Sequence, residues 1–75
     1  MIFIALTRKT DGKKIFVNPK NIFAIYPYFE REDTTVIQSI GDENNYVTVV
    51  ESIESIENML QLLSKGGFNN DTIGD

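Results

Sequence analysis

The chain has 75 residues, with 11 acidic and 7 basic side chains and neither Cys nor His. This length allows one small domain, and the missing residue types exclude disulfides, thiolate metal sites and His-based acid–base catalysis. The net charge of −4 argues against broad nucleic-acid binding, which depends on excess positive charge.

Short apolar stretches in the first fifty residues predict five strands separated by polar turns. We expect these strands at 2–7, 14–18, 22–28, 34–40 and 46–50. The short connections between them favour an antiparallel arrangement. Because both faces of the first strand are largely apolar, we expect it to be central in the sheet or covered on both sides.

Glycine and proline mark the turns between these strands. Asp11-Gly12 tolerates the positive φ of a tight hairpin turn. Pro19 has no N–H for a strand ladder, so it ends the second strand and predicts a short turn or a single helical turn. Pro27 places the end of the third strand at a sheet edge or a bulge.

After Ser52 the apolar residues recur every three or four positions, which predicts one helix with Ser52 as its N-cap. Gly66-Gly67 is its expected end. The stripe expected to face the sheet contains Ile53, Ile56, Met59, Leu60 and Leu63. We therefore predict an α+β fold, in which one helix packs on a small, curled, barrel-like antiparallel sheet of five strands. The predicted domain covers residues 1–67 and is followed by a C-terminal tail, residues 68–75.

Four cations surround the Asp11-Gly12 turn: Arg8, Lys9, Lys13 and Lys14. They are candidates for contact with phosphates or with an acidic partner, although charges at a hairpin tip more often only solvate it.

Aromatic residues around Pro27 form a second candidate site. A small sheet cannot bury all of Tyr26, Tyr28 and Phe29, and Tyr is common at interfaces, so they are predicted to bind protein. The alternative is that alternate rings are buried and Phe29 lies under the loop. Phe68, after the expected helix end, is a further candidate for protein contact or for docking on the sheet.

No set of residues indicates catalysis. Loop acids such as Glu30, Glu32 and Asp33 could hold a hard cation, but isolated loop acids are usually solvated. A helix–loop–helix calcium site starting at Asp42 would place Val47 and Ile53 where Gly and an acid are needed. We therefore expect no catalytic, metal or cofactor site, and no enzyme activity.

Several short motifs carry a family resemblance: Ile4-Ala5-Leu6-Thr7-Arg8, Asp11-Gly12, Val17-Asn18-Pro19, Thr35-Val36-Ile37 and a Val-Val-Glu-Ser-Ile-Glu-Ser-Ile stretch at 49–56. Across roughly residues 2–63 the chain resembles the FlbD-type flagellar and swarming motility proteins, and related short uncharacterised proteins of bacteria and phages. The resemblance implies a shared small fold and an accessory role, and it offers no catalytic residues.

The function expected from the sequence is therefore protein binding, as a non-catalytic adaptor or accessory domain. A domain of this size is marginally stable, so we expect a protein partner or a homo-oligomer. The alternative is a small barrel- or ring-forming protein that binds nucleic acid or a nucleotide. No apolar run approaches the roughly 20 residues of a membrane span. We expect a soluble cytoplasmic protein without cofactors.

Overall fold

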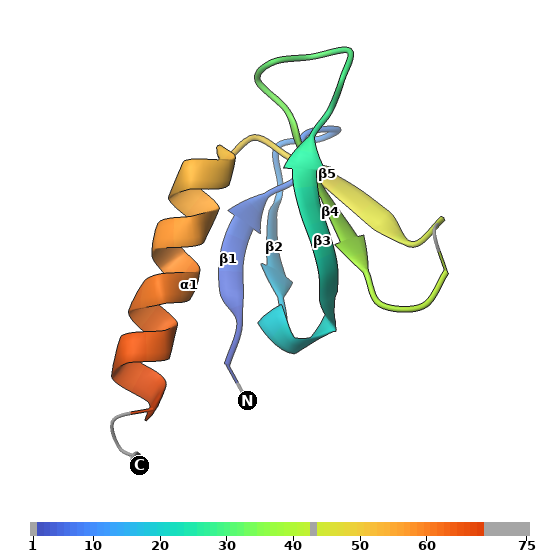
Figure 1. The fold of residues 1–75 in the computed structure, drawn as a ribbon. Helices are drawn as coiled ribbons and strands as arrows, with labels where there is room; N and C mark the ends of the chain where they lie inside the picture. Colours follow the sequence, from blue (N-terminus) through green and yellow to red (C-terminus); the bar gives the residue numbers. More distant parts are fainter. Residues whose placement is uncertain (1, 43, 69–75) are drawn as a thin grey trace.

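The computed structural model of the chain describes residues 2–42 and 44–68, with side chains described as far as Ser64. The expected tail from residue 69 onward lies outside the described residues. Five antiparallel strands and one helix make up the fold (Figure 1), which confirms the α+β class. The elements are β1 (Ile4–Thr7), β2 (Lys14–Val17), η1 (Pro19–Asn21, a 3-10 turn), β3 (Ile22–Pro27), β4 (Thr35–Ser39), β5 (Tyr46–Val49) and α1 (Ile53–Phe68).

The strands form two sheets instead of the single five-stranded sheet that was predicted. β1 pairs with β2, and the second sheet has the order β3-β4-β5. The sheets meet at one corner, where Arg8 bridges to Val49 and the Lys9 N–H donates to the Thr48 carbonyl over 2.8 Å. On the other side, β2 and β3 are not paired with each other in the described chain, so no closed barrel forms.

The turn η1 gives a physical reason for this gap. Pro19 has no N–H, and the Asn18 side chain accepts the Lys20 N–H over 3.0 Å. The Asn21 N–H donates back to the Asn18 carbonyl over 2.9 Å. Because the Lys20 and Asn21 N–H groups and the Asn18 carbonyl form hydrogen bonds within the turn, they do not form ladder hydrogen bonds between β2 and β3. The helical turn predicted at this proline is confirmed.

The core lies between the inner faces of the two sheets and the helix. Its central cluster contains Ile4, Leu6, Ile37, Val49 and Ile56, none of which is more than 4% exposed. Each such side chain stabilises the fold by about 1.5–3 kcal/mol relative to exposure. β1 belongs to a two-stranded sheet, and Ala5 on its opposite face is exposed, so the prediction that this strand is central or covered on both sides is wrong. An antiparallel pair needs only one covered face, and none of the described elements forms a second layer on the other face.

Helix α1 begins as predicted. The Ser52 hydroxyl accepts the Ser55 N–H over 3.1 Å, and the Ser52 carbonyl accepts the Ile56 N–H over 3.0 Å, which is the geometry of an N-cap. The helix continues through Gly66-Gly67 to Phe68, so the predicted end at the glycines is wrong. Glycine costs only about 1 kcal/mol within a helix, which does not oblige the helix to stop.

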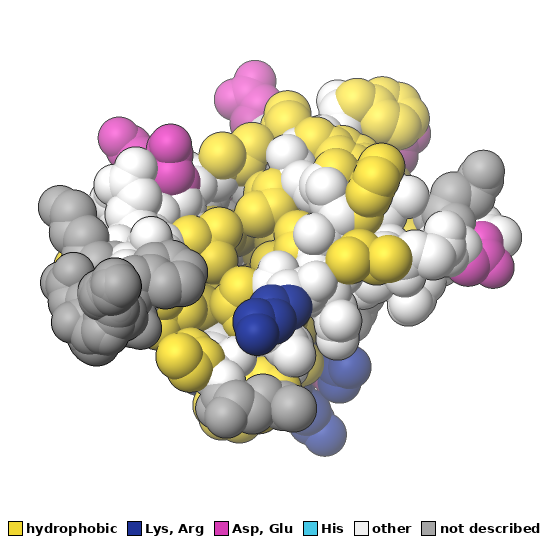
Figure 2. All heavy atoms as spheres, turned by 60° about the horizontal axis from the view of Figure 1, so that its bottom comes forward, with side chains coloured by type: hydrophobic (Ala, Val, Ile, Leu, Met, Phe, Trp, Pro, Cys, Tyr) yellow, Lys and Arg dark blue, Asp and Glu magenta, His cyan; other side chains and the backbone are white. Residues whose placement is uncertain are grey.

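The sheets cover only part of the apolar stripe of α1. Ile56 is fully buried, whereas Met59, Leu60 and Leu63 are half-buried and Ile53 is 38% exposed. Figure 2 views the molecule from the end where β1 begins and α1 ends, and shows hydrophobic side chains across the middle of that face. A considerable part of the apolar surface of this domain therefore remains in contact with solvent.

Candidate functional site

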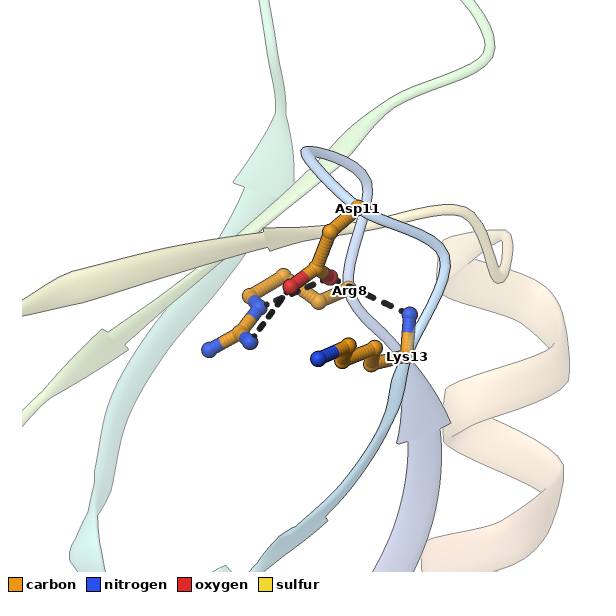
Figure 3. Close-up of polar contacts among 3 residues, drawn as sticks. All are labelled: Arg8, Asp11 and Lys13. Carbon is orange, nitrogen blue, oxygen red and sulfur yellow. Dashed lines mark hydrogen bonds and ion pairs between the residues drawn. The ribbon is translucent and has the colours of Figure 1, made fainter.

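The turn between β1 and β2 is organised around the Asp11 carboxylate (Figure 3). It accepts hydrogen bonds from Arg8 Nε over 3.0 Å and Arg8 Nη2 over 2.7 Å, and from the Lys13 N–H over 3.1 Å. Arg8 first and then the Lys13 N–H lower the pKa of Asp11 below its usual value. Gly12 has φ +72°, which confirms the predicted positive φ. The turn therefore holds the Arg8 guanidinium in a defined position.

A second ion pair joins this turn to the loop between β3 and β4. Lys9 Nζ lies 2.9 Å from Asp33 Oδ2, and this contact, followed by a hydrogen bond from the Thr34 hydroxyl, lowers the pKa of Asp33. Thr34 is buried, and its carbonyl accepts the Tyr28 N–H over 3.0 Å. The loop and the turn thus lie together at the end of the molecule where α1 begins (Figure 1).

An open hollow of about 830 Å³ lies between the turn, the loop and β5. Its lining includes three cationic residues, two tyrosines and a threonine: Arg8, Lys9, Arg31, Tyr28, Tyr46 and Thr48. Among the described residues, no Asp or Glu lines it. In a chain with more acids than bases, this hollow gathers three of the 7 cations, so it is suited to an anionic group.

The hollow combines part of each predicted site. Arg8 and Lys9 come from the basic turn and Tyr28 from the aromatic group, whereas Lys13 and Lys14 do not line it. The Tyr28 hydroxyl donates to Glu30 over 2.9 Å, and this bond raises the pKa of Tyr28.

The remaining aromatic candidates lie elsewhere. Tyr26 is 42% exposed and donates to Gln38 on β4 over 3.2 Å. Phe29 is 89% exposed, with its ring centroid 5.6 Å from that of Tyr28, so the alternative that Phe29 lies under the loop is wrong. The side chain of Phe68 lies outside the described part of the chain.

Several lining residues were not singled out from the sequence as site candidates, among them Arg31, Tyr46 and Thr48. Arg31 stands among acids in a polar loop, and Tyr46 and Thr48 follow the ordinary alternation of a strand, so neither pattern distinguishes them. Tyr46 and Thr48 meet the basic turn because the bridge between Arg8 and Val49 brings β5 beside it, and Arg31 lies on the loop that the Lys9–Asp33 ion pair joins to the turn. No pattern of neighbouring residues in the sequence predicts these long-range contacts.

An apolar surface lies on the outer side of β1 and β2. Phe16 is opposite Ala5 in the strand register, and Phe3 continues the same alternation before β1. Phe16 is 69% exposed and Phe3 is 48% exposed. We call Phe3, Ala5 and Phe16 the outer face. The outer face was not singled out from the sequence. Strand alternation does show that Phe16 points away from the side on which its neighbours Ile15 and Val17 lie.

Other kinds of site find no support in the described residues. No three acidic side chains come together there as a metal-binding group. In the described part of the chain, no helix is both long enough and apolar enough to cross a membrane. Comparisons with family models, curated proteins and solved structures give no match to this chain.

Proposed function

We propose that this chain is a small non-catalytic protein-binding domain. The observation that carries the proposal is the outer face, where two phenylalanines and an alanine stand on an exposed sheet surface. Isolated exposed apolar residues are normal, but aromatic residues gathered on one sheet face are typical of a contact surface. Burying a Phe side chain on binding is worth about 1.5–3 kcal/mol.

The partner proposed for the outer face is a second copy of the chain. Two copies related by a twofold axis would bring Phe16 of one copy near Phe16 of the other, because a twofold interface uses the same patch on both subunits. The charge on this side of the strand pair is mixed, because Lys14 lies there and the Glu51 carboxylate accepts the hydroxyl of Thr7 opposite it. The resemblance to FlbD-type motility proteins and short phage proteins supports an accessory role for such an assembly.

Sedimentation velocity over a wide concentration range tests self-association. We expect the wild type to form dimers at high concentration and Phe16→Thr to shift the equilibrium toward monomer, since Thr keeps strand propensity but removes the ring. Leu62→Gln is the matched control, because Leu62 is also 69% exposed but lies on the helix. A wild type that stays monomeric throughout, or equal effects of both variants, would contradict the proposed contact.

Nucleotide or nucleic-acid binding is the second candidate, and the hollow is the observation that favours it. Arg8, Lys9 and Arg31 could contact phosphates beside Tyr28 and Tyr46, which could stack on bases. Two of these cations already pair with Asp11 and Asp33, which reduces the charge available to a polyanion. Retention on an oligonucleotide resin at low salt tests this candidate, because phosphate contacts are strongest there.

A further inference from the structure

We propose that the hollow binds an extended acidic peptide segment of a partner protein, which adds as a strand to the free edge of β5. The inference rests on the proposed protein-binding function, but it uses residues other than the outer face. The site has two components that a strand of this composition would use together: a cationic lining and an open strand edge.

The open edge follows from the pairing of β5. All four residues of β5 pair with β4, from Tyr46 opposite Gln38 to Val49 opposite Thr35. On its other side, β5 meets the β1–β2 turn only near its end, through the bridge at Val49 and the Lys9 bond to the Thr48 carbonyl. In the described chain, Tyr46 and Val47 have no strand on that side.

The direction of the main-chain groups places this edge in the hollow. The Thr48 carbonyl points away from β4, because it accepts the Lys9 N–H. In an antiparallel strand the main-chain groups two residues earlier point the same way, so those of Tyr46 face the same side. Tyr46, Val47 and Thr48 all line the hollow. An extended peptide entering there can therefore bond to the backbone of β5, as in strand addition to a sheet edge.

The side chains around this edge favour acidic residues in the peptide. Arg8 and Lys9 pair with Asp11 and Asp33, which orients both cations but also reduces the charge that each offers to a carboxylate. Arg31 makes no ion pair among the described residues, which leaves its guanidinium available for a carboxylate. Every second side chain of a strand points to the same face, so alternating acids would meet these cations while the intervening side chains point away.

The same features favour a peptide over a nucleotide. Strand addition uses the unpaired main chain of β5, which a nucleotide does not require. A nucleotide ligand is therefore the competing outcome of the experiment.

Fluorescence polarisation with the intact chain tests the proposal, using a labelled peptide of alternating Glu and Val about ten residues long, the upper length of a typical strand. We expect binding that weakens as salt is raised from about 50 to 500 mM. Arg31→Gln should weaken it about fivefold, as expected for one solvent-exposed ion pair. Lys20→Gln is the matched control, because Lys20 is an exposed cation on η1 that does not line the hollow; it should leave the affinity unchanged.

Three further probes make the test specific. A peptide of alternating Lys and Val, and a Glu–Val peptide methylated at every backbone nitrogen, which has no N–H for a ladder, should both fail to bind. Equal binding of the N-methylated peptide would overturn strand addition. Loss of binding in Lys20→Gln comparable to Arg31→Gln, tighter binding of labelled adenosine triphosphate, or no binding of the Glu–Val peptide would each overturn the proposal. Dimerisation through the outer face is measured separately, so its failure is distinguishable from failure here.

Discussion

Glu51 joins the end of β1 to the connection between β5 and α1. Its carboxylate accepts the Thr7 N–H and the Thr7 hydroxyl, each over 2.9 Å and across 44 positions of sequence. Hydrogen bonds to a charged group contribute about 1.5–3 kcal/mol each when buried, and less when water competes. Since both residues are half-buried, we expect Glu51→Ala to lower the free energy of unfolding by about 2 kcal/mol.

The effect should depend on pH. Burial raises the pKa of Glu51, but the hydrogen bonds from Thr7, aided by Lys14, outweigh it and lower the pKa below the ordinary value of 4.5. A carboxyl group with a lowered folded-state pKa stabilises the fold above its unfolded pKa and loses this contribution as pH falls through the folded value. The difference in free energy of unfolding between wild type and Glu51→Ala should therefore be largest near neutral pH and become smaller below about pH 4.

Urea denaturation followed by circular dichroism measures the difference at each pH. At neutral pH, a loss of about 2 kcal/mol corresponds to a fall in melting temperature of roughly 10 °C for a domain of this size. Glu32→Ala is the control, since Glu32 is exposed and accepts no side-chain hydrogen bond among the described contacts. The reasoning is refuted if the two variants lose equal stability, or if the loss in Glu51→Ala is as large at pH 3 as at pH 7.

Two other predictions concern the helix. Ile56→Ala should destabilise the fold by about 3 kcal/mol because it opens a cavity in the core, whereas Leu62→Ala, at a site 69% exposed, should stay within about 0.5 kcal/mol of wild type in the same urea titration. Similar losses in both variants would show that α1 does not pack through Ile56. Ser52→Ala should cost about 1 kcal/mol by removing the N-cap, with Ser64→Ala near the other end as the control, and an unchanged unfolding midpoint in Ser52→Ala would contradict the capping role.

The local elements follow from local patterns. The period of the apolar residues changes after Ser52, and all five strands and the helix start lie where that pattern places them. The turn residues were informative for the same reason, because φ preferences act within one or two residues: Gly12 has a positive φ, and Pro19 opens a 3-10 turn. The end of α1 was mispredicted because the helix penalty of glycine is small compared with the other terms that set a helix end.

The arrangement of these elements depends on contacts that no local pattern encodes. The alternation within residues 14–17 shows that Phe16 and its neighbours face opposite ways, but it does not show that the outer side of β2 stays uncovered. Likewise, the sequence places four cations near Asp11 but cannot show that Asp11 holds Arg8, that Asp33 holds Lys9, or that Arg31 and Tyr46 arrive beside them.

The sequence by itself therefore determined the class of fold, the number and order of elements, the turn chemistry and the helix start, because each depends on the preferences of residues that are neighbours in the chain. Only the tertiary structure decided how the sheet divides, which apolar face stays in water and which residues surround the hollow. Those features depend on pairings such as Arg8 with Val49 and Thr7 with Glu51, which are separated by more than forty positions and are selected by the packing of the whole domain.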